Sequence, residues 1–135
     1  MKKLFGILIV LSSFVFLGCS ASHLYPNKND SVVGKSYSMI YPYMESEITL
    51  NFEKDRFSGV AGINRIFGEY SISKNNDISF SQVGMTKMAG PLDLMTKEDY
   101  VIGVLNTASK IQFLNHEIII ISKDGKTIKY KHVTK

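Results

Sequence analysis

The residues most able to do chemistry are scattered along this chain of 135 residues. None of the three histidines, His23, His116 and His132, has a second ligand at the spacing of a metal site. The neighbouring acids Glu98 and Asp99 are better explained as first-turn helix residues than as an acid–base pair. Serine and threonine are abundant, but no G-x-S-x-G turn exposes a nucleophile. The sequence therefore predicts no catalytic residue, no metal site and no cofactor.

Cys19 is the only cysteine, and it directly follows an apolar run, Leu4 to Leu17, with Lys2 and Lys3 in front of it. Fourteen residues make a helix of roughly 21 Å, which is shorter than the roughly 30 Å hydrocarbon core of a bilayer. A cleaved secretory signal is therefore favoured over a transmembrane anchor. The segment resembles a bacterial lipoprotein signal peptide, although Phe16 stands where leucine is common. This resemblance implies cleavage after residue 18 and lipidation of Cys19.

An ordinary cleaved signal is the alternative, but it leaves an exported thiol without a role. Lipid chains contribute about 0.8 kcal/mol per buried methylene, so a lipidated Cys19 would hold the protein firmly at a membrane. We therefore expect a protein of the cell envelope whose membrane partner is reached through Cys19. Ser20 is not the aspartate associated with inner-membrane retention, which favours the outer membrane, facing the periplasm, in a Gram-negative host.

The sequence divides into a signal peptide (1–18), a polar tether (19–33) and one domain (34–135). Removal of the signal peptide takes away two lysines and no acid, so the net charge of +4 falls to +2. Such a small charge gives no reason to expect a nucleic-acid partner. With its only cysteine lipidated, the domain has no disulfide and must be stabilised by packing and sheet hydrogen bonds.

Alternating apolar and polar residues predict that most of the domain is β-structure. The expected strands are one around Tyr37 and Met39, then Ile48 to Phe52, Phe57 to Val60, Phe67 to Ile72, Ile78 to Val83, Ile111 to Leu114, Ile118 to Ile121 and Thr127 to Val133. Asn115-His116 and Asp124-Gly125 are predicted hairpin turns, the second a type I′ turn with two positive φ angles. Ile118 to Ile121 is apolar on both faces, which predicts a central, covered strand.

One segment has helical spacing instead. Thr96 is its predicted cap, and Glu98 and Asp99 lie in its first turn. Its apolar face consists of Tyr100 or Val101, Val104 or Leu105, and Ala108, with Lys110 near its C-terminal end. Strands, one helix and three further strands predict an α+β domain built on an antiparallel sheet.

Three motifs occur in the order found in one family. Gly59-Val-Ala-Gly62-Ile-Asn64-Arg-Ile-Phe-Gly68-Glu-Tyr70 resembles the G-x-x-G-C-N-x-x-x-G-x-Y motif of the META domain, or HslJ-like, family. Thr86-Lys-Met88-Ala-Gly90 resembles its T-[RK]-M-A-C motif, and Glu98 with the apolar residues after it resembles its helix. The resemblance extends from Gly34 to Val133. It implies a cracked antiparallel β-barrel with a helix packed against it, and it supplies no catalytic residue, because none is established for the family.

The chain departs from these motifs at two cysteines and at an early tryptophan. The family's cysteines are replaced by Ile63 and Gly90, and both are absent together, as expected if the two positions face each other in the family. Tyr37 stands near the place of the tryptophan. The glycine motif does not have the spacing of a phosphate-binding loop, and no helix follows it. It predicts a tight connection, with glycines at positive φ and Asn64 bonding backbone groups across the turn.

Met85, Met88 and Met95 lie on both sides of Pro91. Core packing is the ordinary interpretation of such methionines, and the alternative is a binding groove formed by Met85, Met88, Leu92 and Met95. A lysine cluster near the C-terminus consists of Lys123, Lys126, Lys129, Lys131 and Lys135. The structural interpretation of this lysine cluster is a solvated sheet face or a sheet edge protected by lysine. The functional alternative is weak attraction to an anionic membrane.

Members of the family are mostly small envelope proteins, often lipoproteins, linked to heat-shock or antibiotic stress. Our leading hypothesis is a non-enzymatic, lipid-anchored envelope protein that binds a protein segment or an apolar ligand, in envelope stress or integrity. A structural envelope module without a defined ligand is the first alternative. An unrecognised hydrolase is the second, and it would require a carboxylate or histidine with a strongly shifted pKa in a cleft.

Overall fold

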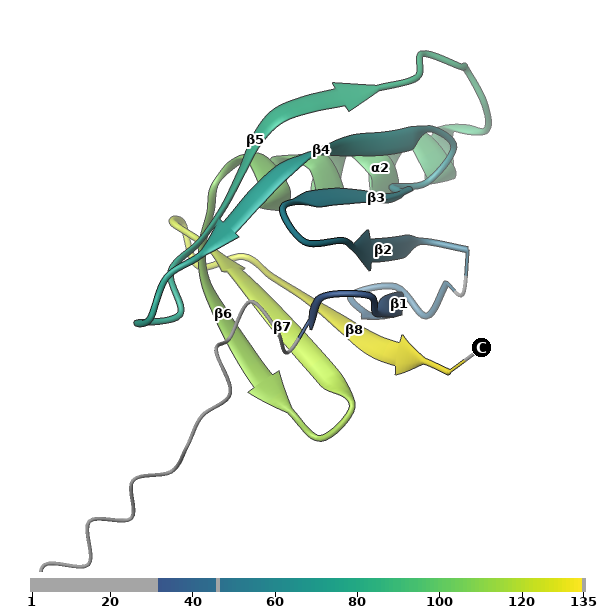
Figure 1. Cartoon of the computed structure of the whole chain (residues 1–135). Coiled ribbons are helices and arrows are strands. Elements are labelled where there is room, and N and C mark those ends of the chain that lie inside the picture. The colour runs from purple at the N-terminus through teal and green to yellow at the C-terminus, as the bar shows by residue number, and fades with distance from the viewer. Residues whose placement is uncertain (1–31, 46, 135) are drawn as a thin grey trace, which may run out of the picture.

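The computed structural model describes residues 32–45 and 47–134, so the predicted signal peptide, Cys19 and most of the predicted tether lie outside it. Eight strands form one antiparallel sheet in the order β5-β4-β3-β2-β1-β8-β7-β6 (Figure 1). In chain order the elements are β1 (Ser36–Tyr41), β2 (Thr49–Phe52), β3 (Arg56–Val60), β4 (Arg65–Ile72), β5 (Ile78–Met85), α2 (Leu92–Asn106), β6 (Ala108–Leu114), β7 (Glu117–Ser122) and β8 (Thr127–Val133).

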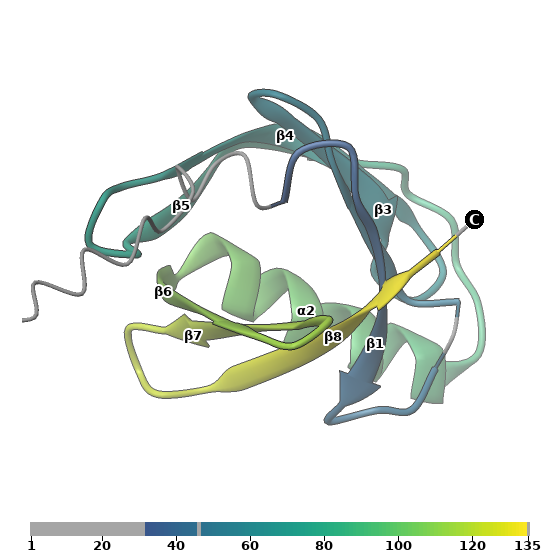
Figure 2. The same cartoon turned by 60° about the horizontal axis from the view of Figure 1, so that its bottom comes forward.

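The sheet curls strongly, and the helix lies within its curve (Figure 2). The edge strands β5 and β6 meet at one end only, through a single bridge between Asp77 and Lys110. There the Ile111 N–H donates to Asn76 O at 3.0 Å, and Lys110 Nζ forms an ion pair with Asp77. The fold is therefore α+β, a half-barrel with one helix, which confirms the expected fold class.

The core fills the space between the curled sheet and the helix. Strand residues alternate between this core and the outer side, most regularly in β4, where every second residue is buried. The largest fully buried side chains are Tyr130, Phe52, Met39, Ile48, Leu50, Ile66, Leu105, Ile111, Ile118, Ile120, Ile128 and Val32. Val32 belongs to the predicted tether, so the packed domain begins earlier than the predicted boundary at Gly34.

The helix begins four residues before its predicted cap. Leu92 is its first residue, and Thr96 lies inside it, where the hydroxyl donates to Leu92 O at 2.9 Å. Pro91 precedes it with φ −54°, a value already suited to a helix start, and needs no side-chain cap. Asp93, rather than Glu98 or Asp99, is the acid of the first turn. The helix ends at Asn106, so the predicted helical residues Ala108 and Lys110 belong instead to β6.

Positive φ angles occur at fewer glycines than predicted. Among the described residues, only Gly34 and Gly125 are glycines with positive φ, so the prediction was wrong for Gly59, Gly62 and Gly68. In the β7–β8 connection Gly125 has φ 86°, but Asp124 has no positive φ. The turn is therefore not type I′. A longer connection with one left-handed glycine reverses the chain instead, and the Gly125 N–H donates to Ser122 O at 3.0 Å.

Strand β7 is apolar on both faces, but only one face is covered by described elements. Ile118 and Ile120 point into the core and are buried. Ile119 and Ile121 point to the outer side, where Figures 1 and 2 show no described helix or strand. The prediction of a covered strand is therefore confirmed for Ile118, Ile120 and Ile119, which is 9% exposed, although no described element packs over the outer face. The strand is second from the sheet edge, between β8 and β6.

Core tyrosines make the fold sensitive to alkali, because burial raises the pKa of Tyr130 as well as those of Tyr37 and Tyr70. Burial raises the pKa of Tyr37 and of Tyr70 from 10.0 to about 12, and Tyr70 and Asp55, respectively, add to these shifts. Between pH 10 and pH 12 the unfolded chain therefore binds fewer protons than the folded one, so stability is fully present below pH 10 and falls as the pH rises through 12. We expect a loss on the order of 2 kcal/mol per tyrosine in urea unfolding across this range. A Tyr37→Phe, Tyr70→Phe variant should lose less over this range, because only the raised pKa of Tyr130 remains, and a loss equal to that of the unmodified protein would contradict this explanation.

Candidate functional site

Asn64 is the centre of a hydrogen-bond network that joins three segments far apart in the sequence. Its side-chain NH₂ donates to Met88 O at 3.1 Å and to Glu98 Oε1 at 2.7 Å. Its Oδ1 accepts from the Met88 N–H at 2.6 Å and from the Thr86 hydroxyl at 3.0 Å. The Asn64 side chain therefore fixes the β5–α2 connection. The prediction that it bonds backbone groups across its own turn was wrong.

Glu98 is the buried acid of this network, with 6% of its surface exposed. Its Oε2 accepts from the N–H of Asn64 at 2.6 Å and from the N–H of Ile63 at 3.0 Å. Both carboxylate oxygens are thus bonded, and the side chain links the helix to the β3–β4 connection. A carboxylate held in this way is suited to fixing backbone groups, and it has no free oxygen aimed at a substrate.

Glycines at the motif positions permit close approach of backbone segments. A Cβ on Gly62 would lie 2.7 Å from Leu94 O and 2.9 Å from the Glu98 Cβ, so the absence of this atom lets the helix reach the β3–β4 connection. A Cβ on Gly68 would lie 2.8 Å from Ser81 O, opposite a bulge in β5. Tyr70, the last residue of that motif, donates its hydroxyl to Glu53 O at 2.5 Å, away from the network.

The four predicted groove residues are all exposed on the surface beside this network. We call Met85, Met88, Leu92 and Met95 the methionine surface. Met88 is 58% exposed and Leu92 80%, and Met85 and Met95 are exposed by more than a third of their surface. The core-packing interpretation was therefore wrong for these methionines. Among the described methionines Met39 alone is buried. A groove at this position stays a prediction, because the pocket of about 410 Å³ found among the described residues lies elsewhere, along β1 and β8.

Ile63 and Gly90, which stand at the family's cysteine positions, are in direct contact. A Cβ on Gly90 would lie 2.4 Å from Ile63 Cδ1 and 3.0 Å from its Cγ1. Because Cγ1 is bonded to Cβ, two β-carbons at these positions would lie within about 4.5 Å, the reach of a disulfide. In this chain the isoleucine side chain occupies the space above the glycine.

We expect an Ile63→Cys, Gly90→Cys variant, made with Cys19→Ser, to form this disulfide on air oxidation. The bond should stabilise the oxidised form by about 2–4 kcal/mol relative to the reduced form, because it constrains the unfolded chain. Urea unfolding with and without reductant measures the difference. The single Ile63→Cys variant is the control, and its stability should not depend on reductant. A double variant that stays reduced would contradict the proposed facing geometry.

The histidines and lysines do not converge on the network. His132 and His116 lie near each other, and the His132 N–H donates to His116 O at 2.6 Å, while His23 lies outside the described residues. No group of three or more His, Cys, Asp or Glu side chains within 32–45 and 47–134 could hold a metal ion. Of the lysine cluster, Lys123 and Lys126 flank the β7–β8 turn, Lys129 and Lys131 are on β8, and Lys135 lies outside the described residues.

Sequence reasoning identified Asn64, Thr86, Met88 and Glu98 separately and missed that they meet. The signal was present in the motifs, since three polar positions with no assigned role fall in the β3–β4 connection, the β5–α2 connection and α2. The assignment of Glu98 to a first helical turn hid its inward orientation. None of the described helices is long and apolar enough to cross a membrane.

A curled antiparallel half-barrel, with one helix fixed to it by a buried polar network, defines the class of small α+β domains to which this protein belongs. Residues 29–134 match the family model described as META domain, and the chain therefore belongs to the META domain family. No curated protein matches the chain.

Solved structures with the same fold share little sequence with the chain. A protein from Burkholderia xenovorans, solved by NMR, is 19% identical, with a TM-score of 0.63 over 79% of this chain and 87% of that one. A second NMR structure is 16% identical, with a TM-score of 0.61 over 76% and 92% of the two chains. A crystal structure of a DUF4847 family protein from Bacteroides vulgatus is 12% identical, with a TM-score of 0.59 over 80% and 99%. At these identities the similarity shows the fold alone.

Proposed function

We propose that this META-domain protein is a non-enzymatic binding protein of the cell envelope, anchored through lipid on Cys19. Its methionine surface binds an apolar segment of an envelope protein or an apolar ligand. The observation that carries this proposal is the exposure of four large apolar side chains at the end of β5, on the β5–α2 connection and in the first turn of the helix. Contiguous exposed apolar side chains are typical of interaction sites, and methionine adapts to partners of different shape.

The network beneath supports this proposal, because it fixes the surface without using the exposed side chains. Both polar backbone groups of Met88 are bonded to Asn64, whereas its side chain is exposed. The shape of the connection therefore does not depend on what the Met88 side chain contacts. A fixed backbone that carries flexible thioethers lowers the conformational cost of binding. The engagement of both Glu98 oxygens supports a non-catalytic role.

The anchor and the envelope location rest on the sequence. Cys19 follows an apolar run of signal length, and no other cysteine is present to pair with it. A role in stress or in envelope integrity is supported by membership of the META domain family. Mass spectrometry of the membrane fraction tests the anchor, since lipidation adds a defined mass to Cys19. A full-length cytosolic chain with a free thiol would overturn it.

Crosslinking in intact envelopes tests the binding surface. A Met88→Ser, Leu92→Ser variant should lose its crosslinked partner while keeping the unfolding midpoint of the unmodified protein. Leu114→Ser is the matched control, because Leu114 is 55% exposed, close to the 58% of Met88, and lies on β6. A partner retained by the double variant, or lost equally in the control, would overturn the proposal and favour a structural module.

A further inference from the structure

The outer side of the sheet has two halves of different composition. On β2 to β5 the outward positions are mostly polar, with Asn51 opposite Ser58 and Ser71 opposite Ser79, and they also include Arg56, Arg65, Glu69 and Phe67. On β1, β8, β7 and β6 two rows of paired residues cross the four strands. One row is Ser38, Lys131, Glu117 and Leu114, and the other is Tyr41, Lys129, Ile119 and Gln112. We call the outer side of these four strands the C-terminal face.

The C-terminal face combines apolar side chains with lysines. Tyr41 is 49% exposed and Leu114 55%, while Ile119 is 9% exposed although no described helix or strand lies over it. Lys129 lies with its Nζ 5.5 Å from the centre of the Tyr41 ring and pairs with Ile119. Lysine and tyrosine side chains have an apolar body and a basic or polar tip, a combination typical of protein surfaces at the bilayer interface.

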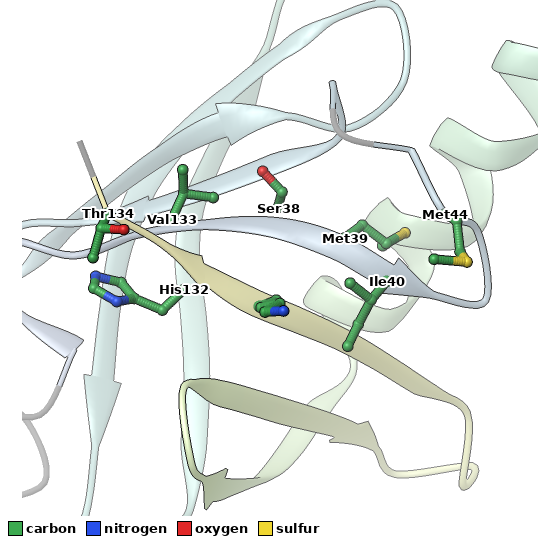
Figure 3. Close-up of a pocket in the computed structure, with 8 residues that line it drawn as sticks. Ser38, Met39, Ile40, Met44, His132, Val133 and Thr134 are labelled. Carbon is green, nitrogen blue, oxygen red and sulfur yellow. The ribbon is translucent and has the colours of Figure 1, made fainter.

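A pocket of about 410 Å³ opens along the edge of this face, between β1 and β8. Ile40 and Met44 line one end of it and Val133 and Thr134 the other (Figure 3). Met44 is 86% exposed and Val133 43%. The pocket adds a shallow apolar depression to the face, and its lining includes Lys131 but no acidic residue.

The described chain begins at Val32, whose side chain lies in the core, four residues before β1 enters this face. Ser36, the first residue of β1, pairs with Val133 near the end of β8. Twelve residues, 20–31, lie between Cys19 and Val32, so thirteen residue steps join the two. At roughly 3.5 Å per residue they span at most about 45 Å, so a lipid on Cys19 keeps the C-terminal face within reach of the bilayer.

We propose that the C-terminal face docks on an anionic lipid bilayer. Lys129 and Lys131 contact the headgroups, while Tyr41, Met44 and Val133 enter the interface. Charge complementarity favours this occupant, because the two crossing rows contain two lysines and one acid, Glu117. This orientation of the domain on the bilayer rests on the proposed lipid anchor at Cys19. It leaves the methionine surface, which lies on other elements, available to a protein partner.

The single cysteine allows a direct test with a chemical anchor. Residues 19–135, which include every described residue, are coupled through Cys19 to a maleimide lipid in vesicles of phosphatidylglycerol or of phosphatidylcholine. Lysine acetylation rates are then mapped by mass spectrometry. Lys129 and Lys131 should react about fivefold more slowly on phosphatidylglycerol, the factor that corresponds to about 1 kcal/mol per lysine near an anionic surface. Lys87 and Lys54, exposed outside this face, should react equally on both.

Tyr41→Ser should abolish this protection, and Phe67→Ser is the matched control, because Phe67 is 46% exposed on β4. Equal acetylation of all four lysines on both vesicles would overturn the proposal. Protection of Lys129 and Lys131 without vesicles, increasing with protein concentration, would overturn it in favour of a second copy on this face. Failure here differs from failure of the proposed function, since the chemical anchor replaces native lipidation and the methionine surface is not involved.

Discussion

Replacing Glu98 by alanine is expected to lower the free energy of unfolding by about 3–5 kcal/mol. The change leaves the N–H groups of Ile63 and Asn64 and the Asn64 side-chain amide without their acceptor in a buried site. Each buried donor without a partner costs about 1–3 kcal/mol. Urea unfolding followed by circular dichroism measures the loss.

Glutamine should not rescue this position, although it has the size of glutamate. Asn64 Oδ1 already accepts from Thr86 and from Met88, so the Asn64 amide cannot rotate to offer an acceptor. The NH₂ group of a glutamine would therefore face another donor. Asp99→Ala is the control, because the neighbouring acid is exposed, and it should change stability by less than about 0.5 kcal/mol. Similar losses for Asp99 and Glu98 would contradict the role of the network.

Gly59→Ala should have an effect of similar size through packing alone. A Cβ at this position would lie 2.1 Å from Thr49 O and 2.9 Å from Thr49 C, which are backbone atoms of the neighbouring strand. The strands would have to separate, at a cost of about 3 kcal/mol or more, above the usual range for overpacking. The expected result is a chain that unfolds at much lower urea or fails to fold.

Gly103→Ala is the matched control, with the opposite expected sign. A Cβ on Gly103 would meet no atom within 4 Å, and the residue lies in the interior of α2, on its exposed face. Alanine is favoured over glycine in a helix interior by about 1 kcal/mol, so this variant should be more stable. Loss of stability in both variants, or in neither, would contradict the argument from close approach at Gly59.

The strands were largely predictable from the sequence, because alternation of apolar and polar residues reports directly on a sheet with one covered face. Thr127 to Val133 agrees with β8 at both ends. The helix start was missed because Thr96 resembles a cap, whereas Pro91 already fixes the backbone angle at which the helix begins. The sequence pattern alone does not decide between a helix that begins after Pro91 and one that is capped by Thr96.

The candidate site was predictable in its residues and not in its geometry. Asn64 and Glu98 are 34 positions apart, and their contact depends on the helix crossing the β3–β4 connection. For the outer face of β7, too, the sequence identifies the residues but not their surroundings. Ile119 and Ile121 are apolar and share a face, but the alternation does not show whether protein or another surface covers them.

The pairing of β1 with β8 has a consequence for how the chain acquires its structure. Ser36 lies opposite Val133, so the first strand receives its second neighbour only when the last strand has been made. Contacts between residues so distant in sequence slow folding, because a long loop must close before they form. A polypeptide that cannot complete its sheet until β8 emerges stays unfolded for longer, as the proposed export through a secretion channel requires. Loss of β8 would leave β1 and β7 with unpaired edges.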